Sequence, residues 1–402
     1  MPERSQAAAM PDPTAPASAS PLPWRRFGQL EAVSAFSLGT MRAIDSAAQM
    51  EAVLRAAWAA GLNHIETAAA YGPAETFLGQ ALARLTAEGV VPPGGWLITS
   101  KILPGPDRVT AQEQLRAMLQ RLGVARLDGL AVHGINQPEH LDWALGGPGA
   151  ELLAWALAEG LVGQVGFSSH GSTPLIERAL ASGRFAFCSL HLHWFDPERL
   201  PLARAALADG IGVMAISPAD KGGRLYDPPD QLLADCAPFH PLELAYRFLL
   251  DQGISTLTLG AAQPSDLALA SAIAGPAAAG EPWLSPAQRH ALQRLEAAGR
   301  ERLGAERCGQ CRACLPCPND VPIPALLRLR NLAVGHGLEV FAKERYNRIN
   351  RAGHWWLTVN AEACGDCGAC LPRCPHGLDI PTLLADTHQR LVALPGRRLW
   401  DD

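Results

Sequence analysis

Eight short apolar runs, rich in β-branched and aromatic residues, recur at intervals of roughly 25 to 45 residues before residue 262. Between them lie segments rich in alanine and leucine, whose charged residues recur every three to four positions as in surface helices. Such alternation predicts parallel strands joined by helices, and eight units close a (β/α)8 TIM barrel, an α/β fold. A shorter open α/β sheet is the alternative. The predicted strands are residues 35–40, 62–67, 96–102, 127–134, 162–168, 185–191, 211–217 and 255–261, with helices over 45–60, 110–121 and 174–182.

Polar side chains gather at the C-terminal ends of these strands, which is where such barrels place their functional residues. One of them alone would usually be an ordinary polar residue with satisfied hydrogen bonds. Six strand ends that all carry polar side chains together indicate a functional site. They are Glu66-Thr67 followed by Tyr71, Ser100-Lys101, His133, Ser168-Ser169-His170, His191 with His193, and Ser217.

Several of these segments resemble the aldo-keto reductases. The resemblance rests on Asn63-His64-Ile65-Glu66-Thr67-Ala68, Tyr71-Gly72, Glu75, Thr99-Ser100-Lys101, Val132-His133-Gly134, Gly166-Phe167-Ser168 and Ser217-Pro218 with Lys221-Gly222-Gly223. When the cysteine runs described below are added to these motifs, the chain is similar to the branch of the family that has a C-terminal ferredoxin-type domain. The resemblance implies a (β/α)8 barrel that reduces aldehydes or ketones with a nicotinamide cofactor.

The resemblance also implies a catalytic group of four residues, and its chemistry is physically reasonable. Hydride transfer to a carbonyl leaves an alkoxide that needs a proton, and Tyr71 would supply it although a tyrosine pKa is about 10. Lys101 would stabilise the phenolate, Glu66 would hold the lysine, and His133 would orient the carbonyl oxygen. The family usually has aspartate at the position of Glu66, which still supplies the charge.

The expected nicotinamide site departs further from the family. Cofactor-binding residues are predicted at Ser168, Ser169, Ser217, Lys221, Gly222 and Gly223. The backbone N–H groups around Lys221-Gly222-Gly223 could cradle a pyrophosphate or another anion, and a plain glycine turn is the alternative there. Leu192 cannot replace the tyrosine that stacks on nicotinamide in relatives, so Trp194 or His193 would have to do so. Residues 260–263 carry no Lys or Arg for the 2′-phosphate of NADP. NAD(P)H use is therefore expected with the preference open.

Eight of the ten cysteines form two short runs. The second, Cys364-x2-Cys367-x2-Cys370-x3-Cys374-Pro375, has the spacing of a bacterial ferredoxin loop. The first, Cys308-x2-Cys311-x2-Cys314-x2-Cys317-Pro318, is one residue shorter. These continuous quartets predict two [4Fe–4S] clusters, and the shorter run is the one whose cluster is more readily altered or lost.

Ligand exchange between the runs is expected if the tail follows two-cluster ferredoxins, in which the fourth cysteine serves the other cluster. One cluster would then be held by Cys308, Cys311, Cys314 and Cys374, and the other by Cys364, Cys367, Cys370 and Cys317. Two structural zinc sites are the alternative, although zinc motifs usually separate two Cys-x2-Cys pairs by a longer loop. Disulfides are disfavoured in a reducing cytoplasm.

Three parts are predicted: a disordered N-terminal segment at 1–25 rich in Pro, Ala and Ser, the barrel at 26–300, and a mainly helical ferredoxin-like domain at 301–395. Helices in the last part are predicted over 322–334, 338–349 and 381–394. The net charge of -5 gives no reason to expect nucleic acid, and no apolar run approaches the ~18 residues of a membrane helix. Free thiols without an export signal indicate a cytoplasmic protein.

The function predicted is an oxidoreductase whose barrel reduces a small carbonyl or related substrate, while the tail transfers electrons to or from a redox partner protein. Nicotinamide moves two electrons as hydride, whereas each cluster passes one. No recognisable flavin motif bridges that difference. The alternative is a non-enzymatic electron-transfer or redox-sensing protein whose barrel is a docking platform.

Overall fold

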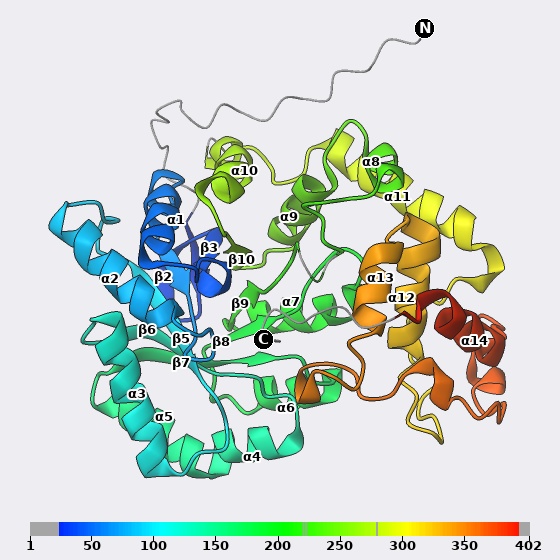
Figure 1. The fold of residues 1–402 in the computed structure, drawn as a ribbon, viewed down its shortest axis with the longest axis horizontal. Coiled ribbons are helices and arrows are strands. Elements are labelled where there is room, and N and C mark those ends of the chain that lie inside the picture. Colours follow the sequence, from blue (N-terminus) through cyan, green and yellow to red (C-terminus); the bar gives the residue numbers. More distant parts are fainter. Residues whose placement is uncertain (1–23, 220, 222, 279, 394–402) are drawn as a thin grey trace, which may run out of the picture.

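A computed structural model describes residues 24–219, 221, 223–278 and 280–393 of the chain (Figure 1). Eight parallel strands close a barrel in the order β10-β3-β4-β5-β6-β7-β8-β9, so the predicted barrel is confirmed and the open sheet is wrong. The strands are β3 (Phe36–Gly39), β4 (His64–Glu66), β5 (Leu97–Ile102), β6 (Leu127–Val132), β7 (Val162–Ser169), β8 (Phe187–Leu190), β9 (Gly212–Ala215) and β10 (Thr256–Gly260).

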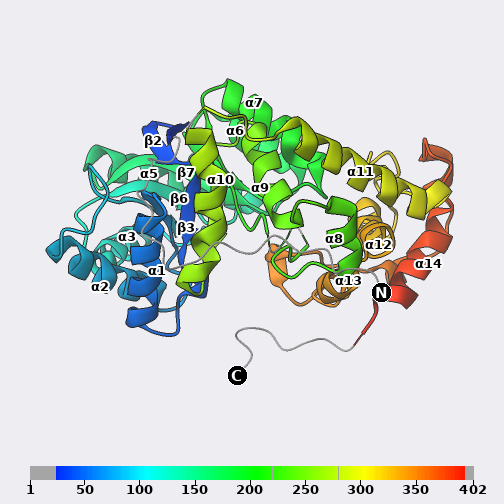
Figure 2. The same ribbon diagram turned by 90° about the horizontal axis from the view of Figure 1, so that it is seen from above.

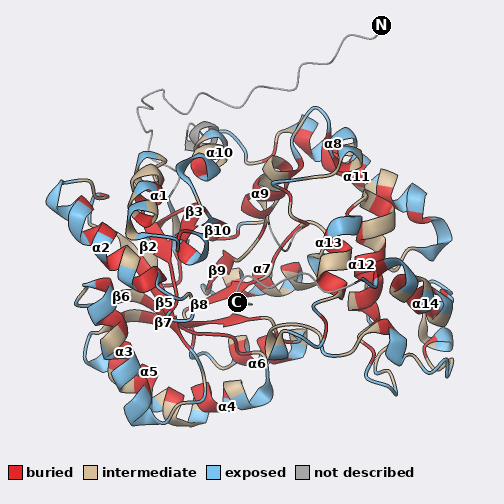
Figure 3. Ribbon diagram, viewed as in Figure 1, coloured by how far each residue is buried: buried red, intermediate tan, exposed pale blue. Residues whose placement is uncertain are grey.

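Helices surround the barrel, and those predicted over 45–60, 110–121 and 174–182 are present. The outer ring consists of α1 (Ala47–Ala59), α2 (Ala74–Ala87), α3 (Arg108–Leu122), α4 (Pro138–Gly146), α5 (Pro148–Ala158), α6 (Thr173–Ala181), α7 (Leu200–Ala208), α9 (Pro241–Asp251) and α10 (Ala268–Ala278). The short helix α8 (Asp230–Cys236) packs against α9 and the helix over residues 286–303. Short 3-10 turns are η1 (Thr40–Arg42), η2 (Pro197–Arg199) and η3 (Pro264–Leu267). Figure 3 shows the strands buried beneath helices whose outer faces are exposed.

A hairpin that the sequence analysis did not predict precedes the barrel. Its strands, β1 (Trp24–Phe27) and β2 (Leu30–Ser34), pair antiparallel, so residues 24 and 25 belong to a strand and not to a disordered segment. Residues 1–23 lie outside the described residues. Phe27 is fully buried against the ring of Phe187, with a centroid separation of 4.9 Å. The hairpin therefore adds an aromatic side chain to the barrel core.

The barrel interior is filled by side chains of complementary size. The ring of Phe187 occupies space beside Gly129 and Gly166, where an added Cβ would lie 3.3 Å and 2.6 Å from it. A fully buried polar layer lies nearby: His64 Nδ1 is 2.6 Å from Ser37 Oγ, and His64 Nε2 is 2.8 Å from Thr99 Oγ1. Because residues two apart on a strand face the same side, His64 and Glu66 both point inward.

The cysteine-bearing part is helical, as predicted. Its main helices are α11 (Pro286–Leu303), α12 (Ile323–His336), α13 (Glu339–Tyr346) and α14 (Ile380–Leu391), with turns η4 (Gly304–Glu306), η5 (Gly353–Trp355), η6 (Ala361–Ala363) and η7 (Leu371–Arg373). In Figures 1 and 2, α11 runs from the barrel side toward α12. It continues across the predicted boundary between residues 300 and 301, which therefore falls inside its last turn.

Ion pairs join this helical part to the loop that follows β8. Arg328 of α12 lies 3.4 Å from Asp196, and Arg312 of the first cysteine run lies 2.7 Å from Glu198. Arg328 and Asp196 are mostly buried, so this contact is sheltered from solvent. The first cysteine run is thus fixed beside a loop at the C-terminal ends of the barrel strands, the end of the barrel that we call its mouth. In the part of the chain that the structure describes, no helix has both the length and the apolar character needed to cross a membrane.

Candidate active site and cysteine pocket

Three of the four predicted catalytic residues are in direct contact at the C-terminal ends of β4 and β5. Lys101 Nζ forms an ion pair with Glu66 and donates hydrogen bonds to the Tyr71 hydroxyl at 2.8 Å and to the Thr67 carbonyl at 3.0 Å. The Tyr71 hydroxyl in turn donates to Glu66 Oε1 at 3.3 Å. Lys101 and Glu66 are 2% and 3% exposed, so the charges are held away from water. The contact aligns an acid, a cation and its counter-ion.

Burial governs how this group titrates. Desolvation raises the pKa of the Tyr71 hydroxyl above its ordinary value and lowers the pKa of the Lys101 ammonium. The hydrogen bond from the ammonium opposes the first shift, and the Glu66 carboxylate opposes the second. Tyr71 is therefore protonated at neutral pH, as a proton donor must be.

His133 joins the group from the end of β6. Its ring lies edge-on to Tyr71 with centroids 5.8 Å apart, and the residue is 8% exposed. Burial, assisted by Lys101 and His354, lowers the pKa of His133 to about 3, so the imidazole is neutral at pH 7. Its Nδ1 has no hydrogen-bond partner among the described residues. A neutral imidazole can orient a carbonyl oxygen by hydrogen bonding.

The two predicted cofactor serines on β7 already hold the neighbouring backbone. Ser168 Oγ accepts a hydrogen bond from the Gly134 N–H at 3.0 Å, and Ser169 Oγ donates to the Ile135 carbonyl at 2.6 Å. Both residues are buried. They fix the loop that carries His133, whatever they contribute to a cofactor.

The predicted anion loop after β9 is described in part, because Gly222 lies outside the described residues. Ser217 has a positive φ of 51°, and its carbonyl accepts from the Lys221 N–H at 3.1 Å. Gly223 is buried with a φ of 123°. This tight turn directs Lys221 inward, where its Nζ lies 3.0 Å from His191 Nε2 and 3.3 Å from His170 Nδ1.

His170, His191 and Lys221 form a cluster of basic residues at the mouth, and the sequence indicated its members but not their contact. His170 and His191 stood out as polar strand-end residues, but their contact with each other, at 3.0 Å, and with Lys221 depends on the closed barrel. Burial, followed by the Lys221 charge, lowers the pKa of both imidazoles. The cluster gives the mouth positive charge beside the catalytic group.

Of the two side chains proposed to replace the stacking tyrosine, Trp194 is packed elsewhere and His193 is buried. Trp194 packs edge-on against Phe248 at 4.7 Å, and His193, which is 3% exposed, accepts a backbone hydrogen bond from the Asp196 N–H at 3.2 Å. Residues 260–263 contain no Lys or Arg, but Arg42 of η1 brings a cation close to this segment. A Cβ on Gly260 would lie 3.2 Å from Arg42 Cδ, and the Arg42 guanidinium lies over the Tyr226 ring at 5.3 Å.

The cysteines fall into two neighbourhoods. Cys317 of the first run lines a small pocket together with three cysteines of the second run, Cys364, Cys367 and Cys370. Burial raises the pKa of Cys308, and the adjacent thiols of Cys311 and Cys374 raise it further. Burial likewise raises the pKa of Cys314 to about 11, with Cys308 and Cys311 adding to the shift. The fold thus brings a cysteine of each run to the other run.

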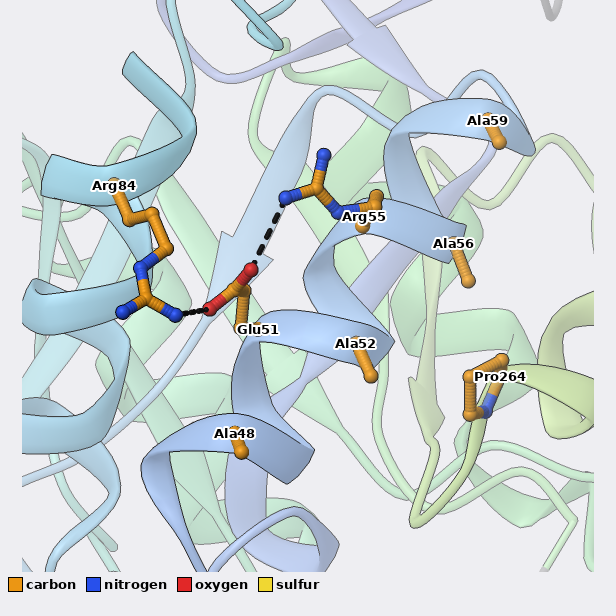
Figure 4. Close-up of a pocket in the computed structure, with 8 residues that line it drawn as sticks. All are labelled: Ala48, Glu51, Ala52, Arg55, Ala56, Ala59, Arg84 and Pro264. Carbon is orange, nitrogen blue, oxygen red and sulfur yellow. Dashed lines mark hydrogen bonds and ion pairs between the residues drawn. The ribbon is translucent and has the colours of Figure 1, made fainter. Parts of the chain in front are cut away.

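Within residues 24–393, leaving out the undescribed positions, no three His, Cys, Asp or Glu side chains are grouped so as to hold a metal ion. A hollow beside α1, whose lining residues are shown in Figure 4, is open to solvent and contains Glu51 paired with Arg55 and with Arg84 of α2. It includes none of the residues at the barrel mouth.

Known proteins share the barrel. The sequence profile of the aldo/keto reductase family matches residues 35–227. An aldo-keto reductase of Mycolicibacterium vanbaalenii is 30% identical over 225 residues, covering 52% of this chain and 72% of that protein. Aldo-keto reductase str7 of Strobilurus tenacellus is 28% identical over 237 residues, covering 52% of this chain and 66% of that protein.

Solved structures agree on the fold. Aldo-keto reductase AKR11C1 of Bacillus halodurans has a TM-score of 0.56 at 18% identity, covering 68% of this chain and 96% of its own. An aldo/keto reductase of Klebsiella pneumoniae in complex with NADP and acetate has a TM-score of 0.52 at 24% identity, covering 68% and 94%. Fold and family together define an oxidoreductase. The chain belongs to the aldo/keto reductase family.

Proposed function

We propose that the barrel reduces a small carbonyl compound with a nicotinamide cofactor as hydride donor, and that Tyr71 supplies the proton. The observation that carries this proposal is the buried contact in which Lys101 donates to the Tyr71 hydroxyl at 2.8 Å while paired with Glu66. A hydroxyl so placed can lose its proton to a developing alkoxide because the ammonium stabilises the phenolate that forms.

The other residues act on the same oxygen atom. Neutral His133 donates a hydrogen bond to the carbonyl oxygen and orients it toward Tyr71. Glu66 keeps Lys101 in place and offsets its charge. After proton transfer, the Tyr71 phenolate recovers a proton from solvent through the barrel mouth. These roles account for why all four side chains converge at adjoining strand ends.

A nicotinamide cofactor, when bound, supplies the hydride. Lys221 and the turn between Ser217 and Gly223 offer a cation and backbone N–H groups for its phosphates. Arg42 beside Gly260 offers a second cation on the neighbouring β10–β3 side of the mouth, which would pair with a 2′-phosphate. The Klebsiella pneumoniae relative solved with NADP supports the same cofactor class here.

The test is turnover under anaerobic conditions with NADH and NADPH supplied separately. The Tyr71→Phe variant keeps the ring and removes the hydroxyl, so carbonyl reduction should fall about 10²- to 10⁴-fold. Cofactor binding should persist in the variant. Equal turnover by both proteins would contradict the role given to Tyr71.

The tail, we further propose, carries two [4Fe–4S] clusters that exchange single electrons with a redox partner protein. The shared pocket of Cys317, Cys364, Cys367 and Cys370 supports one ligand set, and the neighbourhood of Cys308, Cys311, Cys314 and Cys374 supports the other. Four-thiolate zinc sites would draw on the same cysteines, so metal and sulfide analysis separates the two assignments.

A further inference from the structure

A tryptophan from the helical tail lies inside the barrel mouth. Trp355 ends the short turn η5, which lies between α13 and the second cysteine run. Its ring centroid is 5.1 Å from that of His133 and 5.2 Å from that of His170. The residue is far outside residues 35–227, which match the family. The tail therefore contributes a side chain that the family barrel alone does not contain.

The local backbone is arranged to admit this indole. A Cβ on Gly134 would lie 2.6 Å from the Trp355 ring, so any larger residue there would displace it. Gly134 also has a φ of 82°, a conformation that other residues rarely adopt. The position next to His133 is thus matched to Trp355 by both space and backbone shape.

Neighbouring contacts hold the indole in one orientation. His354 Nδ1 lies 3.0 Å from Asn136 Nδ2, and its ring lies 4.9 Å from that of His140. On the other side, Trp356 Nε1 donates to the Arg345 carbonyl at 3.0 Å and packs into the tail. Trp355 is therefore fixed at both ends before any ligand arrives, which lowers the entropy cost of stacking on it.

We propose that Trp355 is a specificity-determining residue, a stacking wall that selects flat, conjugated carbonyl compounds such as aryl aldehydes. This inference rests on the proposed function of Tyr71 and His133, because it places the carbonyl group at those residues. An aromatic ring bound there would meet the half-buried indole next to His133. Offset or edge-to-face ring contacts are favourable, whereas a short alkyl chain gains little from them.

The experiment compares benzaldehyde with propanal in the unsubstituted protein and in Trp355→Ala. The variant should raise the KM for benzaldehyde about tenfold and leave that for propanal within about twofold. Trp155→Ala, which removes a tryptophan on α5 that faces Arg116, is the matched control and should change neither KM. Equal KM changes for both aldehydes, or none, would overturn the proposal. A rise confined to the KM for NADPH would also overturn it, since the wall would then serve the cofactor.

A second readout does not need turnover. Diethyl pyrocarbonate modifies accessible neutral imidazoles, and peptide mass spectrometry would follow His133. In the unsubstituted protein we expect His133 to be modified slowly, and benzaldehyde to slow this modification further. In Trp355→Ala we expect His133 to be modified faster, and benzaldehyde to give no protection. If the unsubstituted protein shows this protection without turnover, the proposed reduction fails while the wall stands. If Trp355→Ala leaves both the rate and the protection unchanged, the wall is refuted whatever the turnover.

Discussion

Removing the charge of Lys101 should destabilise the protein far more than removing an exposed lysine. Lys101 and Glu66 are almost completely buried, so Lys101→Met leaves the Glu66 carboxylate in a desolvated site without its cation. Breaking a buried pair in this way costs about 3–5 kcal/mol. The variant also loses the hydrogen bonds to Tyr71 and Thr67. Removing the other partner of the pair, in Glu66→Gln, leaves the buried Lys101 ammonium without its anion, and we expect it to cost a similar amount of stability.

The double variant Lys101→Met/Glu66→Gln distinguishes this explanation from simple loss of packing. With neither charge present, its cost should be smaller than the sum of the two single costs by about 2 kcal/mol. Urea unfolding followed by circular dichroism would measure all three. The exposed pair Lys343–Glu339, at 41% and 52% side-chain exposure, is the control, and Lys343→Met should cost less than about 1 kcal/mol. Strictly additive single costs would refute the coupling.

Two further predictions concern the cysteine pocket and the buried histidine of the barrel. Cys317→Ser should lower the iron content by about half while Cys188→Ser, in a barrel strand, leaves it unchanged; equal iron in both variants would refute the shared ligand set. Burial lowers the pKa of His64 to about 3 from 6.5, so on acidification the unfolded chain binds this proton before the folded one does. Stability is then lost as pH falls below about 6.5, and between pH 7 and pH 5 His64 should account for about 2 kcal/mol. Urea unfolding of the unsubstituted protein and of His64→Gln at both pH values measures that difference; equal losses would contradict it.

Much of the barrel was predictable because its signals are local. Each strand is a short apolar run, and the closing order follows from eight such runs joined by helices. The catalytic group was predictable because its members end successive strands, which the fold places side by side. The β1–β2 hairpin was missed because its strands are only 4 and 5 residues long and alternate weakly.

The residues that sequence could not supply reach the mouth from elsewhere in the chain. Trp355 is 222 positions from His133, and no periodicity connects them. Arg42 approaches Gly260 because β10 pairs with β3 when the barrel closes. Cys317 meets Cys364 only through folding of the helical tail, although ferredoxin spacing had indicated the exchange. Long-range packing, rather than local pattern, decides all three.

Transfer of deuterium from the cofactor to the product would distinguish hydride reduction in the barrel from reduction by the clusters. Under anaerobic conditions, reduced nicotinamide cofactor carrying deuterium at both C4 positions would be supplied with benzaldehyde, and the alcohol would be analysed by mass spectrometry. We expect the unsubstituted protein to form alcohol with one deuterium on the former carbonyl carbon, and Tyr71→Phe to form it about 10²-fold or more slowly. Two results together would contradict the proposed reduction. They are an alcohol without deuterium, and a Tyr71→Phe variant with chemically reduced clusters that forms this alcohol as fast as the unsubstituted protein does.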